Sequence, residues 1–153
     1  MDFEEISHIE KMCFSPEEAA SVASIEKRLE TFSNHFWLLE HDGRIISVID
    51  GLVTDYEDLT DEMYDNADMH DELGKWQMIF GVETVPEYRH RGYAAELMNY
   101  VINECKNQSR AGIVLTCKEE LIGFYEQFGY KNEGVSESVH GGAVWYQMRL
   151  VLN

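Results

Sequence analysis

The sequence predicts one domain of the mixed α/β (α+β) class, in which a twisted sheet of antiparallel and parallel strands is flanked by helices. Three observations lead to this prediction. The chain has 153 residues, 44% of them hydrophobic and 12% aromatic, so residues 1–153 suffice for one buried core. The apolar spacing switches along the chain between the helical and the strand period. No repeat and no Pro-, Gly- or Ser-rich linker divides the chain.

Two helices are predicted at the N-terminus. Residues 3–13 carry apolar side chains at helical spacing. The segment SPEEAA then predicts the start of a second helix, with Ser15 as N-cap and Pro16 in the first turn. Two acidic residues follow at the positive end of the helix dipole. We expect this helix to run to about Phe32.

A hairpin and a third strand are predicted next. Two apolar runs flank Asp42-Gly43, a dipeptide typical of a two-residue turn between antiparallel strands. Residues 75–85 form a third apolar run with strand character. Between hairpin and strand, residues 54–74 are rich in Asp and Glu and contain no Lys or Arg. This segment is predicted to be a helix or a long loop over the surface.

Five further elements are predicted in the second half, each from its apolar period or its β-branched content. They are a helix over 91–107, a strand over 111–117, a helix over 118–129, and two strands over 130–139 and 143–152. Gly129 ends the second of these helices, and His140-Gly141-Gly142 joins the last two strands. A ligand site is expected at the carboxyl ends of the central strands, where helices begin.

Composition limits the function classes. The net charge of −17 disfavours nucleic-acid partners, whose phosphates need Lys and Arg. The charge would attract cations such as amines and polyamines, or it serves solubility alone. No apolar run approaches the ~20 residues that span a bilayer, and the acidic N-terminus lacks a signal pattern. We therefore expect a cytoplasmic protein without membrane partners.

The three cysteines predict neither a disulfide framework nor a metal site. Cys13, Cys105 and Cys117 are odd in number and widely spaced, which argues against paired disulfides and against a zinc pattern. We expect three small buried side chains and no metal. Because Cys105 and Cys117 fall in apolar elements, both are poor candidates for a nucleophile.

The loop between the third strand and the next helix has the character of a phosphate-binding loop. Arg89, His90 and Arg91 precede Gly92, and small residues open the helix. Backbone N–H groups at a helix N-terminus are unsatisfied and carry partial positive charge. Gly92 lets the backbone approach an anion closely, and arginines add charge beside it. The other interpretation is an ordinary basic, solvated helix start.

These residues give the chain a resemblance to the GNAT superfamily of acetyl-CoA-dependent N-acetyltransferases. The superfamily signature Arg/Gln-x-x-Gly-x-Gly/Ala stands here as Arg89-His90-Arg91-Gly92-Tyr93-Ala94. A second hallmark is FYEQFGY, from Phe124 to Tyr130, and the tail SVHGGAVWYQM fits the closing strand pair. The run LTCKEELIGFYEQFGY is similar to the branch that includes serotonin (arylalkylamine) N-acetyltransferases and their bacterial relatives.

The resemblance implies a role for each matching position. Backbone groups of the splayed strand before the signature, at Val82, Glu83 and Thr84, would bind the pantetheine arm and the thioester carbonyl. The signature loop would bind the pyrophosphate with Arg89, His90, Arg91, Gly92, Tyr93, Ala94 and Ala95. Tyr125 matches the tyrosine beside the coenzyme sulfur. Since a tyrosine hydroxyl stays protonated at neutral pH, Tyr125 is predicted to protonate the leaving thiolate; alternatively it only packs in the core.

The group that accepts the amine proton is left open by the residues. The serotonin enzymes carry two histidines on this strand, and Met78 and Phe80 stand at the matching positions. We predict Glu83 as the base, although strand alternation would point it away from both unless a bulge intervenes. The alternatives are His140, His70 with the acidic segment, and a relayed water without a single base.

The activity that the resemblance implies is direct transfer of the acetyl group of acetyl-CoA to a primary amine of a small molecule, arylalkylamine or polyamine-like. The acidic segment 55–72 would then form a lid that recruits a cationic amine. Two alternatives are a protein N-terminal or lysine acetyltransferase and a catalytically idle acyl-CoA-binding sensor. Partners are coenzyme A and the amine, and a homodimer is common among similar proteins.

Overall fold

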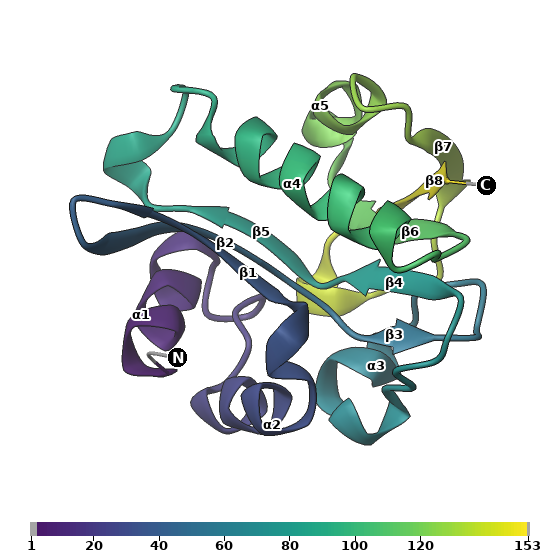
Figure 1. Cartoon of the computed structure of the whole chain (residues 1–153), viewed down its shortest axis with the longest axis horizontal. Coiled ribbons are helices and arrows are strands. Elements are labelled where there is room, and N and C mark those ends of the chain that lie inside the picture. Colours follow the sequence, from purple (N-terminus) through teal and green to yellow (C-terminus); the bar gives the residue numbers. More distant parts are fainter. Residues whose placement is uncertain (1–2, 153) are drawn as a thin grey trace.

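The computed structural model describes residues 3–152 and confirms the mixed α/β class (Figure 1). The helices are α1 (Phe3–Cys13), α2 (Val22–Phe32), α3 (Asp61–Asp65), α4 (Tyr93–Asn107) and α5 (Ile122–Glu126). The strands are β1 (Phe36–His41), β2 (Arg44–Asp50), β3 (Val53–Thr54), β4 (Trp76–Ile79), β5 (Gly81–Thr84), β6 (Gly112–Cys117), β7 (Lys131–Val135) and β8 (Tyr146–Val151). Helices α1, α2 and α3 cover one face of the strands, and α4 and α5 cover the other (Figure 1).

The strands form two sheets, and one continuous stretch of chain, residues 76–84, contributes a strand to each. The first has the order β1-β2-β5 and the second β3-β4-β6-β8-β7, with β4 and β6 as the parallel pair. The predicted strand over 75–85 is therefore split, because β4 belongs to one sheet and β5 to the other. Only Phe80 separates the two strands.

The split opens a wedge between β5 and β6. The ladder of β4 with β6 ends at the pair Ile79 and Leu115, and β5 continues instead on β2, from the pair Gly81 and Asp50. The last residues of β6 keep their partners in β8 on the other side. Beyond Leu115, β6 thus has no hydrogen-bonded neighbour toward β5.

A bulge at Phe80 changes which face the following residues occupy. Met78 and Phe80 pack in the core beneath α1 and α2, while Ile79 and Val82 pack in the second core beneath α4 and α5. Strict alternation would return Val82 to the face of Phe80, so the chain slips by one residue here. Glu83 consequently faces α1, on the side of Met78 and Phe80.

The prediction that the second helix starts at Ser15 is wrong. Ser15 closes only one turn, in which its carbonyl accepts hydrogen bonds from the amides of Glu18 and Ala19, both at 2.9 Å. The amide of Ala20 then donates to the Glu10 carboxylate at 2.8 Å. It therefore does not form the backbone hydrogen bond that would continue a helix. Helix α2 begins at Val22 instead, capped by Ser21, whose side chain accepts from the amide of Ser24 at 3.1 Å.

We expect Ser21→Ala to lower the free energy of unfolding by about 1 kcal/mol, because the substitution removes the cap of α2. Ser15→Ala is the matched control, since the carbonyl that closes its turn is kept, and it should change stability by much less. Urea unfolding followed by circular dichroism measures both. A larger loss for Ser15→Ala than for Ser21→Ala would contradict the observed helix start.

The other predicted elements are present, but the helix predicted over 118–129 is shorter, because α5 ends at Glu126 and not at Gly129. Two further expectations are corrected. The hairpin turns at Asp42 and Gly43, both with positive φ. The acidic segment is not wholly superficial, because Leu59, Met63 and Ala67 are buried. Cys13 is only half-buried, unlike the other two cysteines. Within residues 3–152, no helix has the length and apolar character to cross a membrane.

Candidate functional site

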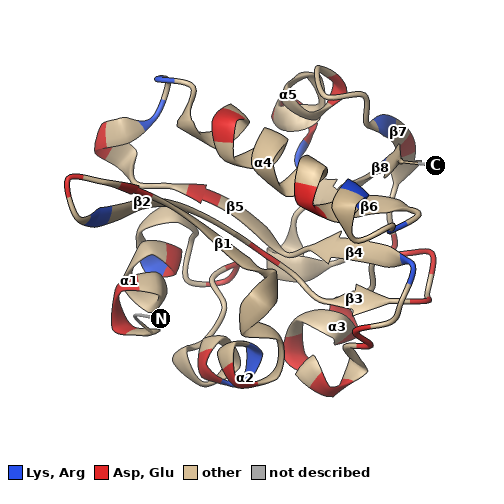
Figure 2. Cartoon of the chain, viewed as in Figure 1, with Lys and Arg blue, Asp and Glu red and all other residues tan. Residues whose placement is uncertain are grey.

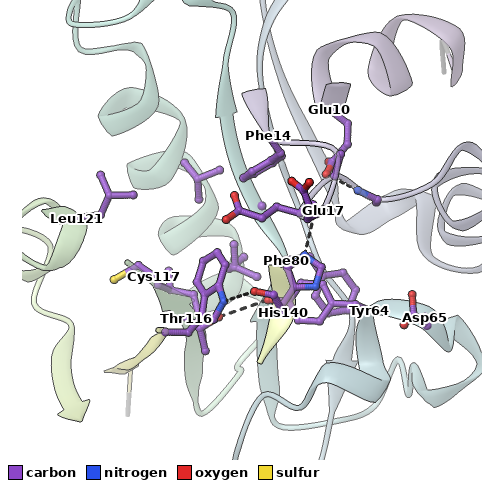
Figure 3. A pocket seen from close by; sticks show the side chains of 18 of the residues that line it. Glu10, Phe14, Glu17, Tyr64, Asp65, Phe80, Thr116, Cys117, Leu121 and His140 are labelled. Carbon is purple, nitrogen blue, oxygen red and sulfur yellow. Dashed lines mark hydrogen bonds between the residues drawn. The ribbon is translucent and has the colours of Figure 1, made fainter. Parts of the chain in front are cut away.

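A cavity of about 320 Å³ lies at the wedge between the two sheets (Figure 3). Its strand walls are Ile79, Phe80, Gly81, Val82, Leu115, Thr116 and Cys117. Figure 3 shows Cys117 and Leu121 on one side of the cavity and Glu10, Tyr64 and Asp65 on the other. The first side is called the thiol end below, and the second the acceptor end.

Tyr125, on α5, lies in the wall of this cavity. Its side chain is only 6% exposed, and burial raises its pKa above the ordinary value for tyrosine. Within residues 3–152 its hydroxyl makes no hydrogen bond, so the proton is free to be given to a ligand. Tyr125 thus presents to the cavity a phenol group that remains protonated at neutral pH.

The loop before α4 presents free amides to solvent. Gly92 has φ +84° and precedes the helix directly; a Cβ would meet open space there, so only the left-handed backbone calls for glycine. The first helical hydrogen bond runs from the amide of Glu96 to the Gly92 carbonyl. The amides of Tyr93, Ala94 and Ala95 therefore have no acceptor in the helix, which suits a pyrophosphate.

Basic residues precede these amides in the chain, and Figure 2 shows the loop as a positive stretch on a largely acidic molecule. Nε of Arg89 donates to the Thr84 carbonyl at 3.1 Å, which ties the loop to the end of β5. Arg91 lies over the ring of Tyr88, 5.4 Å from its centre. His90 has φ +63°, a conformation that costs energy in a non-glycine residue and is typical of ligand-binding loops.

Only one of the three predicted strand positions lies on the cavity. Val82 lines it, whereas Glu83 and Thr84 do not. The Glu83 carbonyl accepts from the Ser47 hydroxyl at 2.7 Å, and the Thr84 carbonyl accepts from Arg89 and from Sγ of Cys13 at 3.4 Å. These two carbonyls are thus engaged within the protein.

The acceptor end has aromatic walls that the sequence did not reveal as one group. Tyr64 stacks on His140 with ring centres 5.2 Å apart and lies 4.6 Å from the ring of Phe80. Trp145 and Phe14 complete the wall. Tyr64 comes from the acidic segment and Phe14 from the end of α1, so only the tertiary fold brings these rings together.

Hydrogen bonds between distant segments join several residues at the acceptor end. Nε2 of His140 donates to the Glu18 carbonyl at 2.7 Å, and Nε1 of Trp145 donates to the His140 carbonyl at 2.7 Å. Lys118 forms an ion pair with the Glu18 carboxylate at 2.7 Å. The acidic segment joins the same network, because Asp61 accepts from the amide of Val139 at 3.0 Å.

Charges at the acceptor end are mainly negative. Glu10, Glu17 and Asp65 line it, and Arg28 is the single Lys or Arg among the lining residues that the structure describes. Arg28 is bound to Asp50 through Nη1 at 3.3 Å, with both side chains buried. The acceptor end is therefore suited to a cation and not to a second anion.

Behind Arg28 lies a buried cluster of carboxyl groups formed by Glu10, Asp50 and Glu83. Burial raises the pKa of Glu83 well above its usual value, and the charges of Glu10 and Asp50 raise it further. Burial also raises the pKa of Asp50, against the opposing charge of Arg28. Arg28 is the cation that contacts this cluster, so ionisation of all three carboxyl groups would leave buried negative charge uncompensated.

A second group of polar side chains, His35, His70 and Glu72, lies outside the cavity. Nδ1 of His70 accepts from the amide of Val53 at 3.0 Å, so Nε2 carries the proton and donates to Glu72 at 2.9 Å. Nε2 of His35 also contacts Glu72 at 3.0 Å, and these residues form a hydrogen-bond network that does not line the cavity. His70, an alternative for the base, is thus away from the cavity.

This chain matches one protein family and is similar to several solved structures. The model of the acetyltransferase (GNAT) family matches residues 3–130. The structure of the GphF GNAT-like decarboxylase in complex with isobutyryl-CoA is 17% identical, with a TM-score of 0.85 over 99% of this chain and 95% of that chain. The loading GNATL domain of CurA from Lyngbya majuscula is 16% identical, with a TM-score of 0.84 over 98% of this chain and 92% of that chain.

A third solved structure contains the acetyl donor itself. A GNAT family acetyltransferase from Brucella melitensis in complex with acetyl-CoA is 15% identical to this chain. Its TM-score is 0.61, over 99% of this chain and 82% of that chain. At such identities the three structures establish a common fold, while the match of the family model extends over most of this chain's length.

Proposed function

This chain belongs to the acetyltransferase (GNAT) family and is an acetyl-CoA-dependent acyltransferase, and we propose that it transfers the acetyl group directly to a primary amine of a small molecule. The observation that carries the proposal is the acceptor end of the cavity. It is acidic and aromatic, and a hydrogen bond between His140 and Glu18 links two of the residues that line it. A small acidic cavity suits a small cation, whereas a peptide acceptor needs an extended open groove.

Both proposed amine classes fit features of this space. In an arylalkylamine, the ring would pack against Phe14, Phe80 and Trp145 while the ammonium faces Glu10. A polyamine would place a second ammonium near Glu17 or Asp65. The resemblance of residues 115–130 to the arylalkylamine branch favours the first class.

In the proposed reaction, some residues bind coenzyme A and another transfers a proton. The loop from Arg89 to Ala95 would hold the pyrophosphate, and the backbone of Val82 would orient the thioester. Tyr125 would protonate the departing sulfur. Cys117 also lines the cavity, but burial raises its pKa to about 11, so it stays a thiol and does not compete as a nucleophile. Transfer would therefore need no acyl-enzyme.

Three competing functions make different demands on the same cavity. A peptide or protein acceptor would have to displace the hydrogen bond between His140 and Glu18. Decarboxylation, the activity in the name of the GphF neighbour, acts on a carboxylated acyl group, which Glu10, Glu17 and Asp65 would repel. An idle acyl-CoA sensor would have no use for an acidic acceptor end.

The test is a thiol-release assay with acetyl-CoA against a panel of tryptamine, phenethylamine, spermidine, an N-terminally free peptide and a lysine peptide. We expect release with at least one small amine and little with either peptide. A parallel reaction with malonyl-CoA, without amine, tests decarboxylation. Preference for a peptide, or carbon dioxide release from malonyl-CoA alone, would overturn the proposal. Calorimetric binding of coenzyme A without any turnover would support the sensor.

A further inference from the structure

We propose that Glu10 is the general base of the proposed amine acetylation, and that Glu83 is a positioning residue that acts through it. The inference rests on the proposed function, because it assigns the group that accepts the ammonium proton. It replaces direct proton acceptance by Glu83, whose side chain faces α1 and does not line the cavity.

Glu10 combines burial with access to the cavity. It lies on α1, is 5% exposed and lines the acceptor end (Figure 3). Its Oε2 accepts from the amide of Ala20 at 2.8 Å, which holds the side chain in one orientation. A hydrogen bond to a backbone amide favours the charged form of a carboxylate. Glu10 is thus an oriented carboxylate at the surface that a cationic amine would contact.

Glu83 lies immediately behind this surface. It is 2% exposed, and its Oε2 has no hydrogen-bond partner within residues 3–152. A Cβ added to Gly81 would lie 2.6 Å from Oε1 of Glu83, so this carboxyl group lies against Gly81, which lines the cavity. A buried carboxyl oxygen without a partner is costly as an anion, which fits a protonated group.

The charges around Glu10 fix which carboxyl group keeps the proton. The carboxyl groups that face it are Asp50 from β2 and Glu83 from β5, the cation is Arg28 from α2, and Cys13 shares its helix. Arg28 forms its ion pair with Asp50. Two neighbouring buried carboxyl groups without a further cation titrate as a pair that shares one proton. Burial and the charge of Glu10 raise the pKa of Glu83, which favours a protonated Glu83 beside the Glu10 carboxylate.

The proton balance of the reaction follows from this arrangement. The alkylammonium, with a pKa of about 10, gives one proton to Glu10 and becomes a free amine. Its nitrogen forms a bond to the acetyl carbon, and the carbon–sulfur bond breaks. Tyr125 gives its proton to the thiolate and regains one from the nitrogen, which becomes an amide. Glu10 then releases its proton to water, so the overall reaction yields the amide, the thiol and one proton.

His140 is the competing base on the cavity. Its Nε2 faces a carbonyl, which only accepts, so Nε2 carries the proton and Nδ1 has the lone pair. However, the ring of His140 is held by the Glu18 carbonyl and stacks on Tyr64, whereas Glu10 offers a carboxylate to the same cavity. A carboxylate also attracts the cationic amine whose proton it would accept.

The experiment compares Glu10→Gln, His140→Gln and Glu4→Gln, the last being an exposed residue of the same helix. We expect Glu10→Gln to lower kcat/KM for the best small amine at pH 7 by about 100-fold or more, with coenzyme A affinity unchanged. The deficit should shrink as pH rises toward 10, because the free amine then needs no base. Glu4→Gln should match the wild type. A wild-type rate in Glu10→Gln, or a pH-dependent deficit found only in His140→Gln, would overturn the inference.

A second pair of variants tests the positioning role of Glu83. If Glu83 is neutral, Glu83→Gln preserves its hydrogen-bonding capacity and should stay within a few-fold of wild-type kcat/KM. Glu83→Leu should shift the acidic limb of the pH profile, because Glu10 loses the group that shares its proton. Loss of activity in Glu83→Gln equal to that in Glu10→Gln would overturn this role.

Carbon-13 NMR of labelled glutamate carboxyls in the ligand-free wild type separates this inference from the proposed function. We expect Glu83 protonated and Glu10 ionised at pH 7, with Glu10 and Glu83 signals assigned through the Gln variants. The opposite protonation pattern would overturn the inference even in an active enzyme. Absence of transfer to every small amine, with the expected pattern present, would count against the amine substrate alone.

Discussion

Tyr125→Phe should lower kcat for acetyl transfer by about 100-fold and leave coenzyme A binding unchanged. The substitution removes only a hydroxyl that lines the cavity and makes no hydrogen bond within residues 3–152. Its raised pKa keeps the proton in place at neutral and moderately alkaline pH, where a leaving thiolate would need it. Steady-state thiol release and calorimetric binding of coenzyme A measure the two quantities separately.

Tyr130→Phe is the matched control for this substitution. Tyr130 is equally buried, but its hydroxyl donates to Sδ of Met98 at 3.4 Å and lies outside the cavity. We expect its kcat to stay near that of the wild type. If Tyr125→Phe retains full activity across the pH range, or if both variants lose it equally, Tyr125 only packs in the core and the acid is another group.

Local patterns predicted much of this fold because the information lies in neighbouring residues. Asp42-Gly43 supplies the positive φ values of its turn, and the apolar period of residues 93–107 gives α4. The split at Phe80 could not be predicted, because it depends on whether β2 or β6 pairs with the strand at each residue. Ser15 also has the local pattern of a helix start, and the contact between Glu10 and Ala20 overrides it.

The residues of the candidate site also fall into two groups, those predicted from the local sequence and those that were missed. Gly92 and Tyr125 were predicted because each belongs to a contiguous motif with a resemblance behind it. Glu10 and Arg28 were missed, although a signal existed. Glu10 lies on the same face of α1 as Ile6, and Arg28 on the same face of α2 as Ile25. A charged residue on an apolar helix face is buried and must find a partner or a function.

Arg28→Met should destabilise the folded protein by about 3–5 kcal/mol, because it leaves buried Asp50 without its cation. The loss should also free Tyr64, whose carbonyl accepts from Nη2 of Arg28 at 3.0 Å. Burial already raises the pKa of Asp50 above its unfolded value. Such a group is harder to keep buried once pH exceeds the unfolded pKa, so the destabilisation should be larger at pH 7 than at pH 4.5.

The double variant Arg28→Met with Asp50→Asn separates charge from packing. Without the carboxylate, no buried charge is left uncompensated at this position, and the double variant should recover a large part of the stability that Arg28→Met loses. Its unfolding free energy should also depend less on pH than that of the single variant. Urea unfolding at pH 4.5 and 7 measures both effects. If the two substitutions simply add, the cost of Arg28→Met arises from lost contacts with the Tyr64 carbonyl and with the ring of Phe80, whose centre lies 4.6 Å from the guanidinium. The buried carboxyl cluster would then tolerate Asp50 without a cation.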